Sequence, residues 1–229
     1  MKTLWVRIFR CSGKYAPTGI RRRGRGAGGG PVASSAVPTA LEALAADLHD
    51  CTRCKLATLG RTQVVFGMGN PTADLMFVGE GPGEQEDLQG EPFVGRAGKL
   101  LTSLIEGIGL TRAEVYIANV VKCRPPGNRD PQPGEIEACR PYLEAQMAFI
   151  RPRVVVTLGN FATKLLLDTK TGITKLRGQE FPYGGDDGTA GVLIPTLHPS
   201  AVLRNGGVAL AQARADFVLV KRALVRVQP

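Results

Sequence analysis

The amino-acid sequence predicts an α/β fold, in which a parallel sheet is covered by helices on both faces. Two observations lead to this prediction. Short, uniformly apolar segments alternate along the chain with longer segments whose apolar residues recur at helical spacing. Strands that are apolar throughout are typical of parallel sheets buried on both sides. The length of 229 residues suits one domain with a substantial core.

The elements follow one another in a regular order. We expect the first helix to be capped by Thr39 and to end at the loop around Cys51. Four strands are then expected at residues 75–78, 115–121, 154–158 and 192–197. The helices between and after them are expected at residues 98–108, 133–150, 160–167 and 208–225.

Residues 1–38 are expected to be a disordered basic tail, and residues 39–229 to form the folded domain. The first 41 residues contain eight Lys or Arg and no acidic residue, whereas the rest contains 21 basic and 20 acidic residues. The net charge of +9 therefore belongs almost wholly to the tail, and it is poor support for nucleic-acid binding by the folded part. A nucleic-acid-tethering arm and a transit peptide remain alternatives for the tail.

Four of the five cysteines, Cys51, Cys54, Cys123 and Cys139, follow the pattern C-x2-C and then C-x15-C, while Cys11 lies alone in the tail. Residues 1–9 make a poor secretory signal, so we expect a reducing, cytoplasmic compartment, in which cysteines indicate a metal site rather than disulfides. The spacing leaves both zinc and an iron–sulfur cluster open. No apolar run approaches the roughly 20 residues of a membrane helix, so no membrane contact is expected.

Polar loops follow three of the expected strands, at residues 79–83, 122–129 and 198–204. Ligands of parallel sheets bind outside the carboxyl ends of the strands, so these loops predict the functional site. The first loop, Gly-Glu-Gly-Pro-Gly, can turn its backbone N–H groups toward a ligand. It differs from a dinucleotide-binding loop because no helix is expected immediately after it and because Glu80 would repel a phosphate.

Several single residues near these loops are ambiguous from sequence alone. Phe93 is either a core aromatic or a platform on which a flat base stacks. Asn119 is either a loop cap or a reader of a base edge, since an amide offers a donor and an acceptor together. Lys122, Arg124 and Arg129 are either solvated charges or phosphate ligands. The lone His198 is either structural or catalytic.

Four segments together resemble the family 4 uracil-DNA glycosylases, the iron–sulfur branch of that superfamily. They are residues 79–83 (GEGPG), 92–98 (PFVGRAG), 119–126 (NVVKCRPP) and 198–200 (HPS). The resemblance implies a three-layer α/β/α sandwich around a mostly parallel four-stranded sheet, and a [4Fe–4S] cluster held by the four cysteines. It also implies hydrolysis of the N-glycosidic bond of uracil in DNA, which releases the base and leaves an abasic site for base excision repair.

The resemblance also implies a role for each site residue. Glu80 would position or activate water and oppose positive charge on the sugar, and His198 would donate a hydrogen bond to uracil O2. The uracil-binding residues would be Gly81, Glu86, Phe93, Asn119 and His198, with Glu86 against C5 of the base. The DNA-binding residues would be Lys122, Arg124, Val202, Leu203 and Arg204, of which Val202 and Leu203 would form an apolar wedge.

Three alternatives remain beside this interpretation. A covalent uracil-trapping relative would carry a reactive histidine in a basic loop before the last strand, and residues 175–181 contain none. A non-catalytic iron–sulfur DNA-binding module, related to phage polymerases, would not require the intact set Glu80, Asn119 and His198. A structural zinc protein would be distinguished by its metal. We expect uracil-containing DNA as the partner, bound by a monomer.

Overall fold

The computed structural model describes residues 6–7, 36–184 and 190–227. Its sheet runs in the order β1-β6-β7-β5-β3-β4-β2. The four central strands are parallel to one another and coincide with the four expected ones. They are β3 (Leu75–Gly79), β4 (Tyr116–Asn119), β5 (Val154–Leu158) and β7 (Ala190–Thr196). The apolar runs therefore identified the buried centre of the sheet correctly.

The prediction of four strands was wrong, because the described part of the chain forms a sheet of seven strands. The three further strands lie toward its edges: β2 (Met68–Gly69), β6 (Phe181–Gly184) and β1 (Val6–Arg7). β2 is antiparallel to β4, β6 is antiparallel to β7, and β1 is parallel to β6. β1 and β2 have two residues each, and β6 contains Pro and Gly, so none of them shows an apolar run that sequence patterns could reveal.

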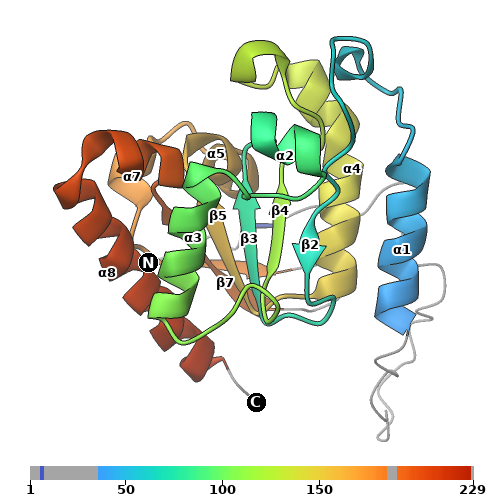
Figure 1. Cartoon of the computed structure of the whole chain (residues 1–229). Coiled ribbons are helices and arrows are strands. Elements are labelled where there is room, and N and C mark those ends of the chain that lie inside the picture. The colour runs from blue at the N-terminus through green and yellow to red at the C-terminus, as the bar shows by residue number, and fades with distance from the viewer. Residues whose placement is uncertain (1–5, 8–35, 185–189, 228–229) are drawn as a thin grey trace, which may run out of the picture.

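Helices cover both faces of the sheet, which confirms the three-layer α/β/α architecture (Figure 1). One face is covered by α3 (Arg96–Gly107), α7 (Pro199–Asn205) and α8 (Gly207–Arg226). The other is covered by α4 (Pro133–Ile150) and α5 (Asn160–Leu167). The amphipathic patterns placed α3, α4, α5 and α8 correctly, within two residues at each end. Helix α7, by contrast, lies where the sequence analysis expected a loop.

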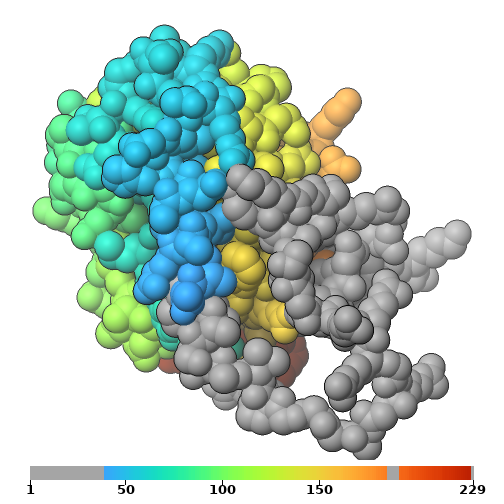
Figure 2. All heavy atoms as spheres, turned by 90° about the vertical axis from the view of Figure 1, so that its right-hand side faces the viewer, coloured from blue at the N-terminus to red at the C-terminus, as the bar shows by residue number. Residues whose placement is uncertain are grey.

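A further helix, α1 (Ala36–Leu48), packs on the outer side of α4. Leu44 and Leu48 contact Tyr142 and Ala145, and Tyr142 donates a 2.9 Å hydrogen bond to Asp47. Figure 2 shows α1 in blue lying on the yellow surface of α4. This packing brings the loop after α1, with its first two cysteines, to the helix that carries Cys139.

The first helix begins at a different residue from the one expected. Helix α1 begins at Ala36, so Thr39 lies inside the helix and does not cap it. Within residues 1–38, the structure describes β1 and the start of α1. The rest of the expected disordered tail lies outside the described residues.

Short helices carry the loops around the sheet's carboxyl edge. They are α2 (Glu84–Gln89), α6 (Ile173–Leu176) and the 3-10 helices η1 (Lys55–Ala57) and η2 (Pro126–Asn128). The expectation that no helix follows the glycine loop was wrong, because α2 begins directly after Gly83. Six residues are too few to show helical periodicity, but the acids of its first turn suit a helix N-terminus. None of the described helices has the length and apolar character to cross a membrane.

Candidate active site

A cavity of about 630 Å³ opens at the carboxyl edge of the central strands. Residues from the loops after β3, β4, β5 and β7 line it, so the loops that the sequence singled out do converge. Seven of the predicted site residues belong to this lining: Glu80, Gly81, Glu86, Phe93, Asn119, His198 and Arg204. Lys122, Arg124, Val202 and Leu203 do not belong to it.

Glu80 follows the last residue of β3 and is half-buried in the cavity wall. Burial, and secondarily the nearby carboxylate of Asp130, raise the pKa of its carboxyl to about 7. Near neutral pH this group therefore exists in both protonation states. A carboxylate with such a pKa suits general base catalysis or the stabilisation of a developing positive charge.

Phe93 has a backbone conformation that is rare outside glycine, with φ of +56°. Arg112 holds this turn, because its guanidinium donates to the carbonyl oxygens of Pro92 at 2.7 Å and Phe93 at 3.2 Å. The ring lies so close to Gly79 that a Cβ there would be 2.6 Å from a ring carbon. Phe93 belongs to the core cluster, which confirms the first interpretation, and it also lines the cavity, so the stacking of a base on its ring stays a prediction.

Asn119, at the end of β4, is buried, and its Oδ1 has no hydrogen-bond donor among the described residues. A buried polar atom without a partner costs about 1–3 kcal/mol. Because this side chain lines the cavity, a ligand with an N–H group could supply the missing partner. The unpartnered amide oxygen therefore marks the place in the cavity where a hydrogen-bond donor of a ligand would fit.

His198 caps the N-terminus of α7 through its side chain. Its Nδ1 accepts the backbone N–H of Ser200 at 3.2 Å and also lies 2.8 Å from the Ser200 hydroxyl. Burial, and secondarily the charge of Arg204, lower the pKa of the imidazole to about 4, although Glu86 acts in the opposite direction. The ring is therefore neutral at pH 7, and since Nδ1 accepts a proton donor, the ring's own proton lies on Nε2.

Glu86 joins the two loops on either side of α2. One carboxylate oxygen accepts the N–H groups of Val94 and Gly95, both at 2.9 Å, and the other accepts the Gly83 N–H at 3.1 Å. Glu86 also lines the cavity, as its expected place beside the base requires. Its backbone contacts show that it additionally holds the glycine loop against the Phe93 loop, a role that the sequence did not suggest.

Two of the predicted DNA contacts are wrong. Lys122 is fully buried, and its Nζ donates to the carbonyl of Asn119 at 2.9 Å and to Gln146 Oε1 at 2.6 Å. Val202 is 2% exposed and packs in the core. Neither side chain can reach a DNA strand, because each is enclosed by residues distant in sequence.

The other three predicted DNA-binding side chains are accessible. Leu203 is 44% exposed, next to the buried Val202 on α7. Arg204 is exposed at the rim of the cavity. Arg124 is half-buried and donates through Nε to Asn128 Oδ1 at 2.8 Å. The proposed wedge is thus reduced to one apolar side chain.

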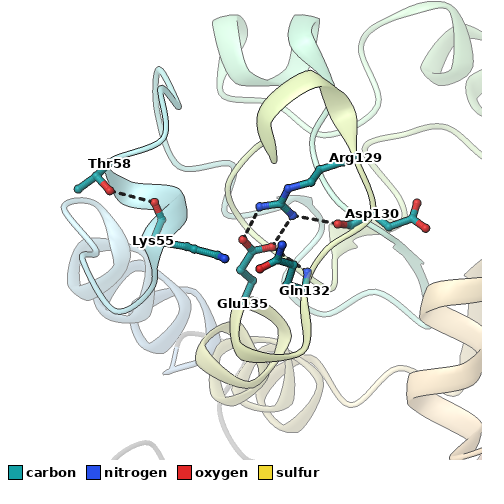
Figure 3. A network of polar contacts seen from close by, with 6 residues as sticks. All are labelled: Lys55, Thr58, Arg129, Asp130, Gln132 and Glu135. Atoms are coloured by element: carbon teal, nitrogen blue, oxygen red, sulfur yellow. Dashed lines mark hydrogen bonds and ion pairs between the residues drawn. The ribbon is translucent and has the colours of Figure 1, made fainter.

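Asp130 is a cavity residue that the sequence analysis missed. Its neighbour Arg129 forms two hydrogen bonds to the buried carboxylate of Glu135, at 2.6 and 2.9 Å, and a third to the Asp130 carbonyl. Figure 3 shows the Asp130 carboxylate pointing away from this network, and Lys55 beside Glu135. The sequence could have indicated Asp130, because it is an acidic residue in the loop that follows β4 at the carboxyl edge of the sheet.

The four predicted metal ligands are free cysteines, of which Cys123 and Cys139 are buried. Burial raises the pKa of both thiols, that of Cys139 to about 12, and the neighbouring thiolates contribute further in each case. Arg61 joins two of the cysteine segments, since it donates to Cys123 Sγ at 2.9 Å and to the Cys51 carbonyl at 2.7 Å. Among the described residues, no three Cys, His, Asp or Glu side chains converge closely enough to hold one metal ion.

Comparison with known proteins agrees with this geometry. The sequence model of the Uracil DNA glycosylase superfamily matches residues 66–220. A Type-4 uracil-DNA glycosylase of Sulfurisphaera tokodaii is 48% identical over 170 residues, 72% of this chain and 76% of that protein. Type-4 enzymes of Thermotoga maritima and Saccharolobus solfataricus are 49% and 45% identical, over 72% and 80% of this chain and 84% and 86% of their own. This chain therefore belongs to the uracil-DNA glycosylase superfamily and, within it, to the type-4 family.

Proposed function

We propose that this protein excises uracil from DNA by hydrolysing its N-glycosidic bond, which releases free uracil and leaves an abasic site for base excision repair. One observation supports this proposal above the others. The buried, unpaired Oδ1 of Asn119 lies in the same cavity as the carboxylate of Glu80 and the neutral imidazole of His198. Asn119 can thus recognise the edge of a base, Glu80 supplies an anionic group, and His198 supplies a hydrogen-bond donor.

Base capture depends on Phe93 and Asn119. A target base inside a duplex must be flipped out of the stack, at a cost of a few kcal/mol. The Phe93 ring offers a stacking surface for it, and Asn119 Oδ1 accepts the N3–H of uracil while the amide N–H donates to O4. Cytosine carries a lone pair at N3 instead of N–H, so Asn119 Oδ1 would remain without a donor. That unpaired contact disfavours cytosine.

Bond cleavage places negative charge on the departing base and positive charge on the sugar. His198 Nε2–H donates to uracil O2 as the base becomes anionic, and the low pKa of the ring keeps it neutral in that role. A preorganised donor of this kind typically lowers the barrier by about 3–4 kcal/mol. Ionised Glu80 opposes the sugar's positive charge and orients the attacking water.

DNA contacts surround this cavity. The exposed Leu203 is the side chain available to enter the base stack, and Arg204 and Arg124 are the cations available to the backbone. We propose that the protein acts as a monomer in the cytoplasm, on single- or double-stranded DNA. The free thiols suit a reducing compartment.

Cys51, Cys54, Cys123 and Cys139 would hold a [4Fe–4S] cluster. The set fits, because it consists of free thiols close enough to affect one another's pKa, with the cationic Arg61 against Cys123. Each thiolate of such a cluster binds a different iron, so the sulfurs need not converge on one ion. When bound, the cluster supplies a cross-link between the loop after α1 and the segment 123–139, and hydrolysis requires no redox step.

The test uses the full chain and a labelled oligonucleotide with one uracil, followed by alkali. Strand breakage at uracil, absent from a matched thymine oligonucleotide, is the expected result. The Glu80→Gln variant, purified in the same way, controls for a contaminating glycosylase and should produce little breakage. Equal breakage by parent and variant, or none by the parent with its cluster intact, would contradict the proposed function.

A further inference from the structure

A second cavity, of about 380 Å³, lies on the loop between α5 and the end of α6. Its lining consists of Lys170, Thr171, Gly172, Thr174 and Lys175. Both lysines are exposed, and no carboxylate belongs to the lining. Neither lysine forms an ion pair in the part of the chain that the structure describes. The cavity thus presents two unneutralised ammonium groups and two hydroxyls.

This second cavity adjoins the uracil pocket. Ile173 lies between Gly172 and Thr174 in sequence and lines the uracil pocket. Its backbone N–H donates to Asn160 Oδ1 at 2.9 Å, and Asn160 also lines that pocket. The segment that carries the two lysines therefore reaches the wall of the proposed uracil pocket.

The loop is held at its other end as well. Arg177 directly follows α6, and its guanidinium forms two hydrogen bonds with the buried carboxylate of Asp216 on α8. It also donates to the Gln212 carbonyl at 2.7 Å. With Asn160 at one end and Asp216 at the other, the segment that carries the lysines has a defined place at the pocket rim.

Charge considerations favour a role for these lysines. The chain after residue 41 is almost neutral, with 21 basic and 20 acidic residues, so its attraction to DNA must come from local groups. Two cations near the pocket are unavailable, because Lys122 is buried and Arg129 is paired with Glu135. Lys170 and Lys175 carry positive charge at the rim without such partners.

We propose that the cavity of Lys170 and Lys175 binds a backbone phosphate of DNA beside the flipped nucleotide. Two ammonium groups and the hydroxyls of Thr171 and Thr174 match the acceptor oxygens of a phosphodiester. Such an interaction fixes the strand next to the pocket without reading sequence. This inference rests on the proposed function, since it takes DNA as the ligand.

The test is a double variant, Lys170→Gln with Lys175→Gln, compared with a double variant at two exposed lysines outside both cavities, Lys164→Gln with Lys221→Gln. Dissociation constants for a uracil-containing duplex are measured at several salt concentrations in the Glu80→Gln background, which prevents turnover. The first pair should weaken binding about three- to tenfold and reduce the slope of log K against log salt by about 0.9 for each phosphate that is no longer neutralised. The control pair should change neither quantity.

The excision rate at saturating DNA should stay at the parent value in the Lys170/Lys175 variant, because a group that binds the backbone positions the strand and takes no part in the chemistry. Arginine at both positions should preserve the salt slope. Equal affinities and slopes for the two glutamine pairs would overturn the proposal. Binding is also measured with a uracil-free duplex, which tests the phosphate site without any excision. If the enzyme binds DNA with the expected salt slope but releases no uracil, the proposed function is contradicted and the phosphate site is not.

Discussion

The rings of Phe93 and His198 are neighbours in the cavity wall, with ring centroids 5.7 Å apart and ring planes inclined by 37°. The two rings come from different elements: Phe93 from the loop before α3, and His198 from the N-terminus of α7. In the proposed function, the Phe93 ring covers the face of the base and the His198 ring reaches its edge. That proposal assigns recognition and chemistry to separate side chains.

Replacement of these two residues should separate binding from catalysis. His198→Ala removes a donor to charge that exists fully only in the transition state, so single-turnover excision should fall by about 10²- to 10³-fold with little change in DNA affinity. Phe93→Ala should weaken capture of the base by about 1–3 kcal/mol. Single-turnover rates and dissociation constants at one salt concentration test this. Excision by His198→Ala at the parent rate would show that the assigned donor is wrong.

The carboxylate of Glu80 should control the pH dependence of excision. Its pKa in the free enzyme is raised to about 7, chiefly by burial. Because the ionised form is the active one, kcat/KM should rise with pH through about 7 and then level off. Glu80→Gln should reduce single-turnover excision by on the order of 10²-fold and abolish this rise. A parent profile that is flat between pH 6 and 8 would contradict the assignment.

Asp130 should influence the same profile through its charge. Its carboxylate raises the pKa of Glu80, so Asp130→Asn should move the rising limb of kcat/KM to lower pH and leave the plateau unchanged. The other charged groups of the cavity, Glu86, Arg129 and Arg204, stay in place in this variant. Asp168→Asn, outside the cavity, is the matched control and should leave the limb where it is. If kcat/KM of the Asp130→Asn variant rises over the same pH range as in the parent, the carboxylates of Asp130 and Glu80 are not coupled.

Lys122 should stabilise the fold and make no contact with DNA. Lys122→Met leaves the Asn119 carbonyl and Gln146 Oε1 without their donor, which should lower the free energy of unfolding by about 2–4 kcal/mol. The slope of DNA affinity against salt should equal that of the parent. Denaturant unfolding and salt titration of binding measure the two effects, with iron content determined in parallel. A reduced salt slope at unchanged stability would restore Lys122 as a phosphate ligand.

The metal site makes a prediction about composition. The parent protein should contain about four irons per chain and no stoichiometric zinc. Serine at Cys51, Cys54, Cys123 or Cys139 should lower the iron content, whereas Cys11→Ser should not. Elemental analysis after anaerobic purification measures this. Stoichiometric zinc without iron would identify the site as a zinc centre instead.

The sequence by itself determined the framework of this protein. Residues 133–150, 154–158 and 160–167 form the predicted helix, strand and helix with the predicted bounds, because long apolar patterns reflect which face of an element is buried. It also determined that the functional loops meet, since the carboxyl ends of parallel strands lie at one edge. The sequence did not predict the edge strands or α2, because each is too short to show a hydrophobic periodicity.

Only the tertiary structure decided which polar side chains are available to a ligand. Lys122 is a basic residue in a loop segment, yet it is buried because Gln146, 24 residues away, supplies its acceptor. Val202 and Leu203 are adjacent and both apolar, and the packing of α7 alone determines that one enters the core and the other faces solvent. Asp130 acts on Glu80 from 50 positions along the chain. Burial and electrostatic coupling depend on neighbours in space, which no local pattern records.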